Sequence, residues 1–129
     1  MEEITANVSW VAVAVGAVAS MILGFIWFNP KMPLGRAWAE GTGVGLEPPE
    51  NFPALAMGMN TLGVFLVSWF VGVTAANNAL LTVILATLGF SVWVGGNVLF
   101  SGNSKGAMAV TSSYWIVSVL LMIISQAIF

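Results

Sequence analysis

The chain has 129 residues, of which 59% are hydrophobic and only 6% are charged, and its formal net charge is −2. A water-soluble domain carries about 25% charged residues, and one of this size could not hide so much apolar surface, so the composition predicts a membrane protein. Nucleic-acid binding would need a basic patch and is not expected, and the absence of cysteine excludes disulfides and thiolate metal sites.

Four apolar segments, each close to the roughly 20 residues that a membrane helix needs, follow one another along the chain. They extend over about residues 8–28, 54–76, 79–100 and 106–128. The three basic and five acidic residues all lie outside these segments. The pattern predicts a single membrane domain over residues 1–129, with an all-α fold that is an integral membrane four-helix bundle.

Small side chains recur at helical spacing in three of the segments. They are Ala12, Gly16, Ser20 and Gly24 in the first, Ser68, Gly72 and Ala76 in the second, and Ser91 and Gly95 in the third. Such stripes let helix backbones approach closely in a bilayer. We expect most of them to pack within one chain, while contact with another chain stays open. Gly16→Leu is expected to disrupt packing more than Val13→Leu does.

The loop after the first segment, about residues 29–53, gathers helix breakers and charge. Its two early prolines are expected to end the first helix. The stretch "PLGRAWAE" then predicts a short interfacial helix, because Leu34 and Trp38 would share one face and lie in the headgroup plane. Arg36 and Glu40 are expected to pair at i, i+4.

The basic residues predict the orientation. Lys31 and Arg36 lie in the first loop and Lys105 lies in the third. Because basic loops stay in the cytoplasm, both termini are expected outside, in a bacterial inner membrane. Trp27 and Trp38 are expected to anchor the first loop at headgroup level, where its two cations would attract anionic lipid.

Polar and aromatic side chains at similar depth form the candidate site. The possible lipid or ligand contacts are Trp27, Lys31, Arg36, Trp38, Asn60, Trp93, Asn97, Tyr114 and Trp115. One hypothesis is a polar and aromatic pocket for a lipid headgroup or small amphiphile. Gly35 is expected to let the short helix of the first loop lie close against the bundle, where Asn97 and Tyr114 could meet Arg36. The other hypothesis is that the amides bond across helices and the tryptophans only pack.

Three stretches of the chain resemble a known family. "NVSWVAVAV", "GFIWFNPKMPLGRAWAE" and "SYWIVS" are similar to an uncharacterised membrane-protein family, the domain of unknown function numbered 1761. Gly24, Trp27 and Pro30 match its pattern, whereas Phe28 replaces a usual tyrosine and Arg36 stands where lysine is common. The resemblance implies a four-helix membrane protein and supplies no activity.

Catalysis is not expected, because the chain has no histidine or cysteine and its acidic residues lie at the N-terminus or in the first loop. No enzyme, metal or cofactor is therefore predicted. The leading hypothesis is a structural or accessory subunit that self-associates or packs against a larger membrane complex, with lipid in its grooves. The alternative is a passive channel or small-molecule transporter that works as a homo-oligomer. The spans lack the ionisable residues that coupled transport generally uses.

Overall fold

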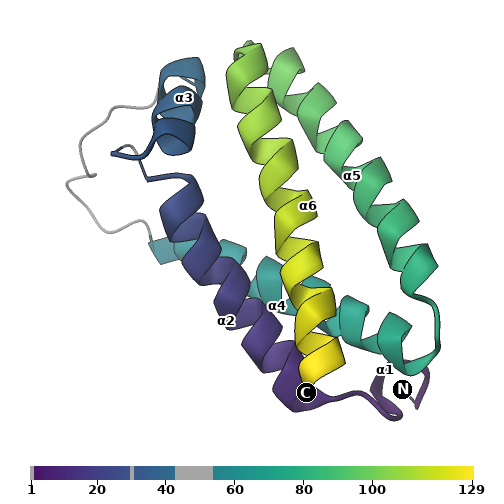
Figure 1. Cartoon of the computed structure of the whole chain (residues 1–129). Coiled ribbons are helices and arrows are strands. Elements are labelled where there is room, and N and C mark those ends of the chain that lie inside the picture. Colours follow the sequence, from purple (N-terminus) through teal and green to yellow (C-terminus); the bar gives the residue numbers. More distant parts are fainter. Residues whose placement is uncertain (1, 30, 43–53) are drawn as a thin grey trace.

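A computed structural model describes residues 2–29, 31–42 and 54–129 (Figure 1). Its helices in these ranges are α1 (Glu2–Thr5), α2 (Trp10–Trp27), α3 (Pro33–Thr42), α4 (Ala54–Ala76), α5 (Leu80–Phe100) and α6 (Lys105–Ile128). The helices α2, α4, α5 and α6 are long and apolar enough to cross a membrane. The predicted all-α membrane protein is confirmed, with spans that agree closely with the apolar segments. Pro30 and residues 43–53 of the predicted loop lie outside the described residues.

Local signals set where the long helices begin and turn. Ser9 precedes α2 and Ser104 precedes α6, and the Oγ of each accepts a hydrogen bond from a backbone N–H of the first turn. These are N-caps, which satisfy donors that a helix start leaves free. Asn78 has a φ of 55° between α4 and α5, and Gly102 has a φ of 84° between α5 and α6. Asparagine and glycine tolerate this left-handed backbone. The chain can therefore reverse its direction within a few residues at both turns.

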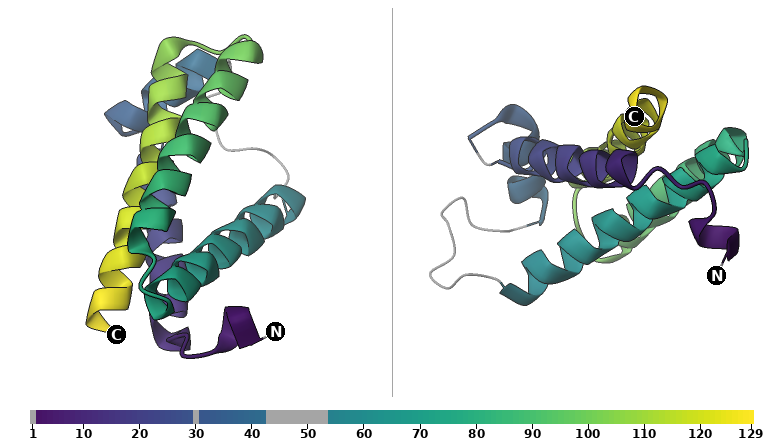
Figure 2. Two further views of the ribbon diagram at one scale, coloured as in Figure 1. Left: turned by 90° about the vertical axis from the view of Figure 1, so that its right-hand side faces the viewer. Right: turned by 90° about the horizontal axis from the view of Figure 1, so that it is seen from below.

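The spans form a bundle that is open on one side. The central helix is α6, which packs against α2 and α5, while α3 lies beside its N-terminal end (Figure 1). Figure 2 shows that α4 leans away from the other spans toward its N-terminal end. Its contacts with α5 are correspondingly few, and it meets α2 through its C-terminal half. Both termini lie at the same end of the bundle (Figure 1).

The small residues of α2 lie where it meets α4 and α6. Those that are buried are Ala12, Gly16 and Ser20. A Cβ atom on Gly16 would lie 2.9 Å from Ser68 Oγ and 3.2 Å from Met122 Cα. Ser68 Oγ donates a hydrogen bond of 2.7 Å to the carbonyl of Val13, which ties α4 to α2. The glycine therefore allows both the close approach and the hydrogen bond.

The small residues that were expected to pack are buried in α5 but only partly buried along α4. In α5, Ser91 and Gly95 are buried, and the Ser91 carbonyl accepts a hydrogen bond of 2.9 Å from Ser112 Oγ of α6. In α4, Gly72 is buried and Ala76 is half-buried. Earlier in that helix Ala56 and Asn60 are exposed, because this half of α4 leans away from its neighbours.

Val13 is not the tolerant position that the comparison with Gly16 assumes. Its side chain is 0% exposed, and its Cγ2 lies 2.9 Å from where a Cβ on Gly72 would stand. The choice of Val13 as the mild substitution is therefore wrong. The physical reason is that α2 is covered by both α4 and α6, so its buried arc is wider than one stripe. Val18, on the same helix and 57% exposed, is the proper lipid-facing control.

Candidate functional site

Side-chain donors join α2 to α6 along most of their length. The hydrogen bonds run from Ser20 Oγ to the Ser118 carbonyl (3.3 Å), from Tyr114 OH to the Ser20 carbonyl (2.8 Å), from Ser125 Oγ to the Ala12 carbonyl (2.7 Å) and from Trp27 Nε1 to the Val110 carbonyl (2.9 Å). Each acceptor is a carbonyl of the facing helix. Such bonds stabilise membrane bundles by about 0.6 kcal/mol each. These four polar groups thus serve to hold the fold.

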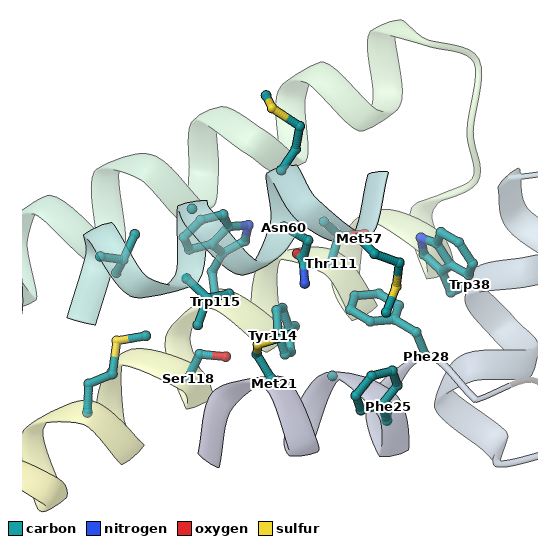
Figure 3. A pocket seen from close by; sticks show the side chains of 16 residues that line it. Met21, Phe25, Phe28, Trp38, Met57, Asn60, Thr111, Tyr114, Trp115 and Ser118 are labelled. Atoms are coloured by element: carbon teal, nitrogen blue, oxygen red, sulfur yellow. The ribbon is translucent and has the colours of Figure 1, made fainter. Parts of the chain in front are cut away.

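A cavity of about 550 Å³ lies where α4 leans away from α2 and α6 (Figure 3). The side chains labelled there are Met21, Phe25 and Phe28 of α2, Trp38 of α3, Met57 and Asn60 of α4, and Thr111, Tyr114, Trp115 and Ser118 of α6. The wall is mostly apolar, with thioethers and aromatic rings. None of the lining residues within 2–29, 31–42 and 54–129 carries a charge.

An aromatic row closes the cavity toward α3. The Phe28 ring lies edge-on to Trp38, with centroids 5.2 Å apart, and edge-on to Tyr114, with centroids 5.1 Å apart. These geometries are the favoured ones for aromatic pairs. The Tyr114 hydroxyl is used by its hydrogen bond to α2, so the ring presents apolar surface to the cavity.

Polar side chains of the cavity wall, including Asn60, Thr111 and Ser118, carry groups that have no hydrogen-bond partner among the described residues. Figure 3 shows the Asn60 carboxamide reaching from α4 into the cavity, toward Tyr114. Its side chain makes no hydrogen bond within the described part of the chain. The Oγ1 of Thr111 is buried and also lacks a partner among the described residues. The cavity therefore offers unused hydrogen-bonding groups in an apolar setting.

The structure brings together only part of the predicted site. Trp38, Asn60, Tyr114 and Trp115 line the cavity. The remaining predicted contacts, Trp27, Lys31, Arg36, Trp93 and Asn97, do not line it.

Those remaining residues have other surroundings. Trp93 stacks on Phe90 on the exposed face of α5, with an interplanar angle of 8°, and Asn97 is exposed on the same helix. Trp27 turns its indole N–H inward to α6 rather than toward the headgroups. Lys31 is exposed.

The predicted pairing within the first loop is confirmed, because Arg36 Nε lies 3.3 Å from Glu40 Oε1. The expected meeting of Arg36 with Asn97 and Tyr114 is wrong. The described part of α3 packs on α6 and α2 and makes no contact with α5, and the Tyr114 hydroxyl bonds to α2 instead.

Gly35 lies at the close contact between α3 and the end of α2. Gly35 and Ala39 are the buried residues of this helix, while Leu34 is 42% exposed. A Cβ on Gly35 would overlap the backbone of Asn29, so only glycine lets α3 fold back against the end of α2. Close backbone approach, rather than hydrophobic spacing, sets which face is buried.

A second hollow lies on the other side of α4. It is a groove of about 360 Å³ between α4, α5 and α6, with Phe70, Phe90, Trp115 and Val119 in its wall. Among the described residues of its wall, only Thr87 carries a hydroxyl, which donates to its own helix at the Val83 carbonyl. Sequence reasoning missed this groove, because apolar side chains inside apolar spans give no contrast. It also missed the methionines of the cavity for the same reason.

A comparison with protein families gives one match that covers most of the chain. The model described as a protein of unknown function, DUF1761, matches residues 11–125. Comparisons with curated proteins and with solved structures find no match. The chain therefore belongs to the DUF1761 family of proteins of unknown function.

Proposed function

We propose that this protein is a non-catalytic membrane subunit, structural or accessory, whose open bundle is completed by lipid. The observation that carries the proposal is the pair of hollows on either side of α4, one of about 550 Å³ and one of about 360 Å³. Empty apolar space forfeits dispersion contacts, and lipid chains are the apolar molecules that surround a membrane span. Lipid chains in these hollows would therefore support the tilted α4.

The side-chain chemistry supports a non-catalytic role. The chain has no cysteine and no histidine, the residues that most often supply nucleophiles, metal ligands and proton carriers. The hydroxyls between α2 and α6 are largely donated to backbone carbonyls, as described above. What the spans offer to other molecules is mainly apolar surface.

The outer face of α5 supports packing against another membrane chain, either a second copy or a larger complex. A Cβ built on Gly89 or Gly96 would meet nothing within 4 Å. Glycines on a lipid-facing helix let a partner helix approach closely.

Lipid retention tests the proposal. The protein is purified in a mild detergent and its bound lipids are counted by native mass spectrometry. We expect retained lipid, and we expect Ala86→Phe, which fills the groove between α4, α5 and α6, to lower retention. The matched control is Leu85→Phe, on the same helix but outside the groove wall and 72% exposed.

The same preparation in liposomes tests the alternative of a passive channel. The proposal expects no solute flux above that of protein-free vesicles. Flux of small solutes together with no retained lipid would overturn the subunit hypothesis and favour the channel.

A further inference from the structure

We infer that the cavity between α2, α4 and α6 is a specific site for one uncharged amphiphile that carries a hydroxyl or carbonyl group. The inference deepens the proposed function, which requires only that lipid chains fill the hollows. It assigns a polar recognition element to this cavity and none to the groove on the other side of α4.

The size and the wall of the cavity suit a small amphiphile. Its volume of about 550 Å³ falls within the range of about 300–1,000 Å³ that is typical of small-molecule sites. Met21, Phe25 and Phe28 line it from the side of α2, and Met57 lies opposite them on α4. Thioethers are flexible and polarisable, and rings give rigid apolar surface, so together they adapt to an alkyl or ring-shaped body.

The polar element is the Asn60 carboxamide. It enters the cavity from α4 and has no hydrogen-bond partner within the described residues (Figure 3). Asn60 is exposed at the open edge of the cavity, so its carboxamide offers two donors and an acceptor to a molecule that enters there. Thr111 Oγ1, on the facing helix α6, is buried and also unpartnered. A ligand with a hydroxyl or carbonyl group would supply the missing partner to Asn60.

The charges of the site select against ionised head groups. None of the described residues in the cavity wall is acidic or basic. Arg36, on the helix that supplies Trp38, is 65% exposed at its side chain and pairs with Glu40 outside the cavity. A phosphate or carboxylate inside would be a charge without a counter-ion, which is strongly unfavourable in an apolar interior. The ligand class is therefore neutral.

The groove between α4, α5 and α6 provides the contrast within the same molecule. Its wall is apolar, and the hydroxyl of Thr87 is already bonded to its own helix. An alkyl chain would fit there with or without a polar head. Selectivity for a hydroxyl is thus expected from the cavity and not from the groove.

Three probes with the same alkyl chain and different ends test the inference. They are 1-hexadecanol, hexadecane and ionised hexadecanoate, and their equilibrium binding is measured with the full chain in neutral detergent. We expect 1-hexadecanol to bind about tenfold more tightly than either of the others, the effect of one well-made hydrogen bond to a carboxamide. Equal binding of the three probes would overturn the inference.

Two variants locate the selectivity. Asn60→Leu should remove the preference for 1-hexadecanol and leave hexadecane binding unchanged, whereas Asn97→Leu, which removes the same group from the exposed face of α5, should change neither. Gly63→Leu should lower binding of 1-hexadecanol by filling the cavity, since a Cβ at this lining position meets nothing within 4 Å. A preference that survives Asn60→Leu would refute the assignment.

The outcomes separate this inference from the proposed function. If the three probes bind alike while lipid retention still falls in Ala86→Phe, the specific site is refuted and the lipid-filled subunit stands. If hexadecanol selectivity depends on Asn60 but no lipid is retained by the native chain, the specific site stands and the proposed function fails.

Discussion

Replacing Gly16 by alanine adds a single methyl group at the point where α2 meets α4 and α6. The new Cβ would lie 2.9 Å from Ser68 Oγ and 3.2 Å from Met122 Cα. The serine hydroxyl can rotate away, but it then loses its hydrogen bond of 2.7 Å to the Val13 carbonyl. The Met122 Cα belongs to the backbone of α6 and moves only if that helix shifts. The substitution therefore acts on both contacts at once.

The expected change in stability combines two effects that lower it and one that raises it. Overpacking of a well-packed interior costs about 1–3 kcal/mol. Loss of an interhelical hydrogen bond in a membrane protein costs about 0.6 kcal/mol. Alanine in place of glycine in a helix interior recovers about 0.5–1 kcal/mol. We therefore expect Gly16→Ala to lower the free energy of unfolding by about 1–3 kcal/mol, and Gly16→Leu to lower it further.

Unfolding in mild detergent by added dodecyl sulfate, followed by tryptophan fluorescence, measures this loss. Gly58→Ala on α4 is the matched control, because its Cβ would meet nothing within 4 Å. It should leave stability unchanged or raise it by up to about 1 kcal/mol. For the leucine variant the control is Val18→Leu, at an exposed position of α2. If Gly16→Ala is as stable as Gly58→Ala, the close crossing at Gly16 does not exist in the membrane.

Three further predictions rest on other contacts. Tyr114→Phe removes a hydrogen bond of 2.8 Å between α6 and α2 and should lower the free energy of unfolding by about 0.6 kcal/mol in the same assay, whereas an unchanged stability would mean that the hydroxyl is not bonded there. Gly35→Ala should detach α3 from the end of α2 and speed tryptic cleavage after Arg36 without changing the helical content in circular dichroism; an unchanged cleavage rate would contradict the backbone overlap. Single cysteines at Asn77 and Ser101, in the two short turns of this cysteine-free chain, should label from opposite sides of the membrane, with Asn77 reached from outside; labelling of Ser101 from outside in intact cells would reverse the predicted orientation.

The sequence by itself determined the elements that depend on neighbouring residues. The separation of charged from apolar stretches located the four spans, because an uninterrupted run of about 20 apolar residues can satisfy its backbone in lipid only as a helix. The i, i+4 spacing of Arg36 and Glu40 likewise predicted a helical turn in the first loop and the pair that the structure contains. Both conclusions need only local chemistry.

Only the tertiary structure decided which face of each span is used. Asn60 and Asn97 are the same residue type near corresponding ends of two spans, yet one reaches into a cavity and the other lies on the outer face of α5. Trp93 and Asn97 were likewise grouped with the candidate site from their depth alone, yet both lie on the exposed face of α5. In spans that are apolar all round, hydropathy does not mark the buried side, because lipid and protein interior are alike to an apolar side chain. Helix rotation and the tilt of α4 follow instead from close backbone contacts at glycine and from hydrogen bonds between helices far apart in the sequence.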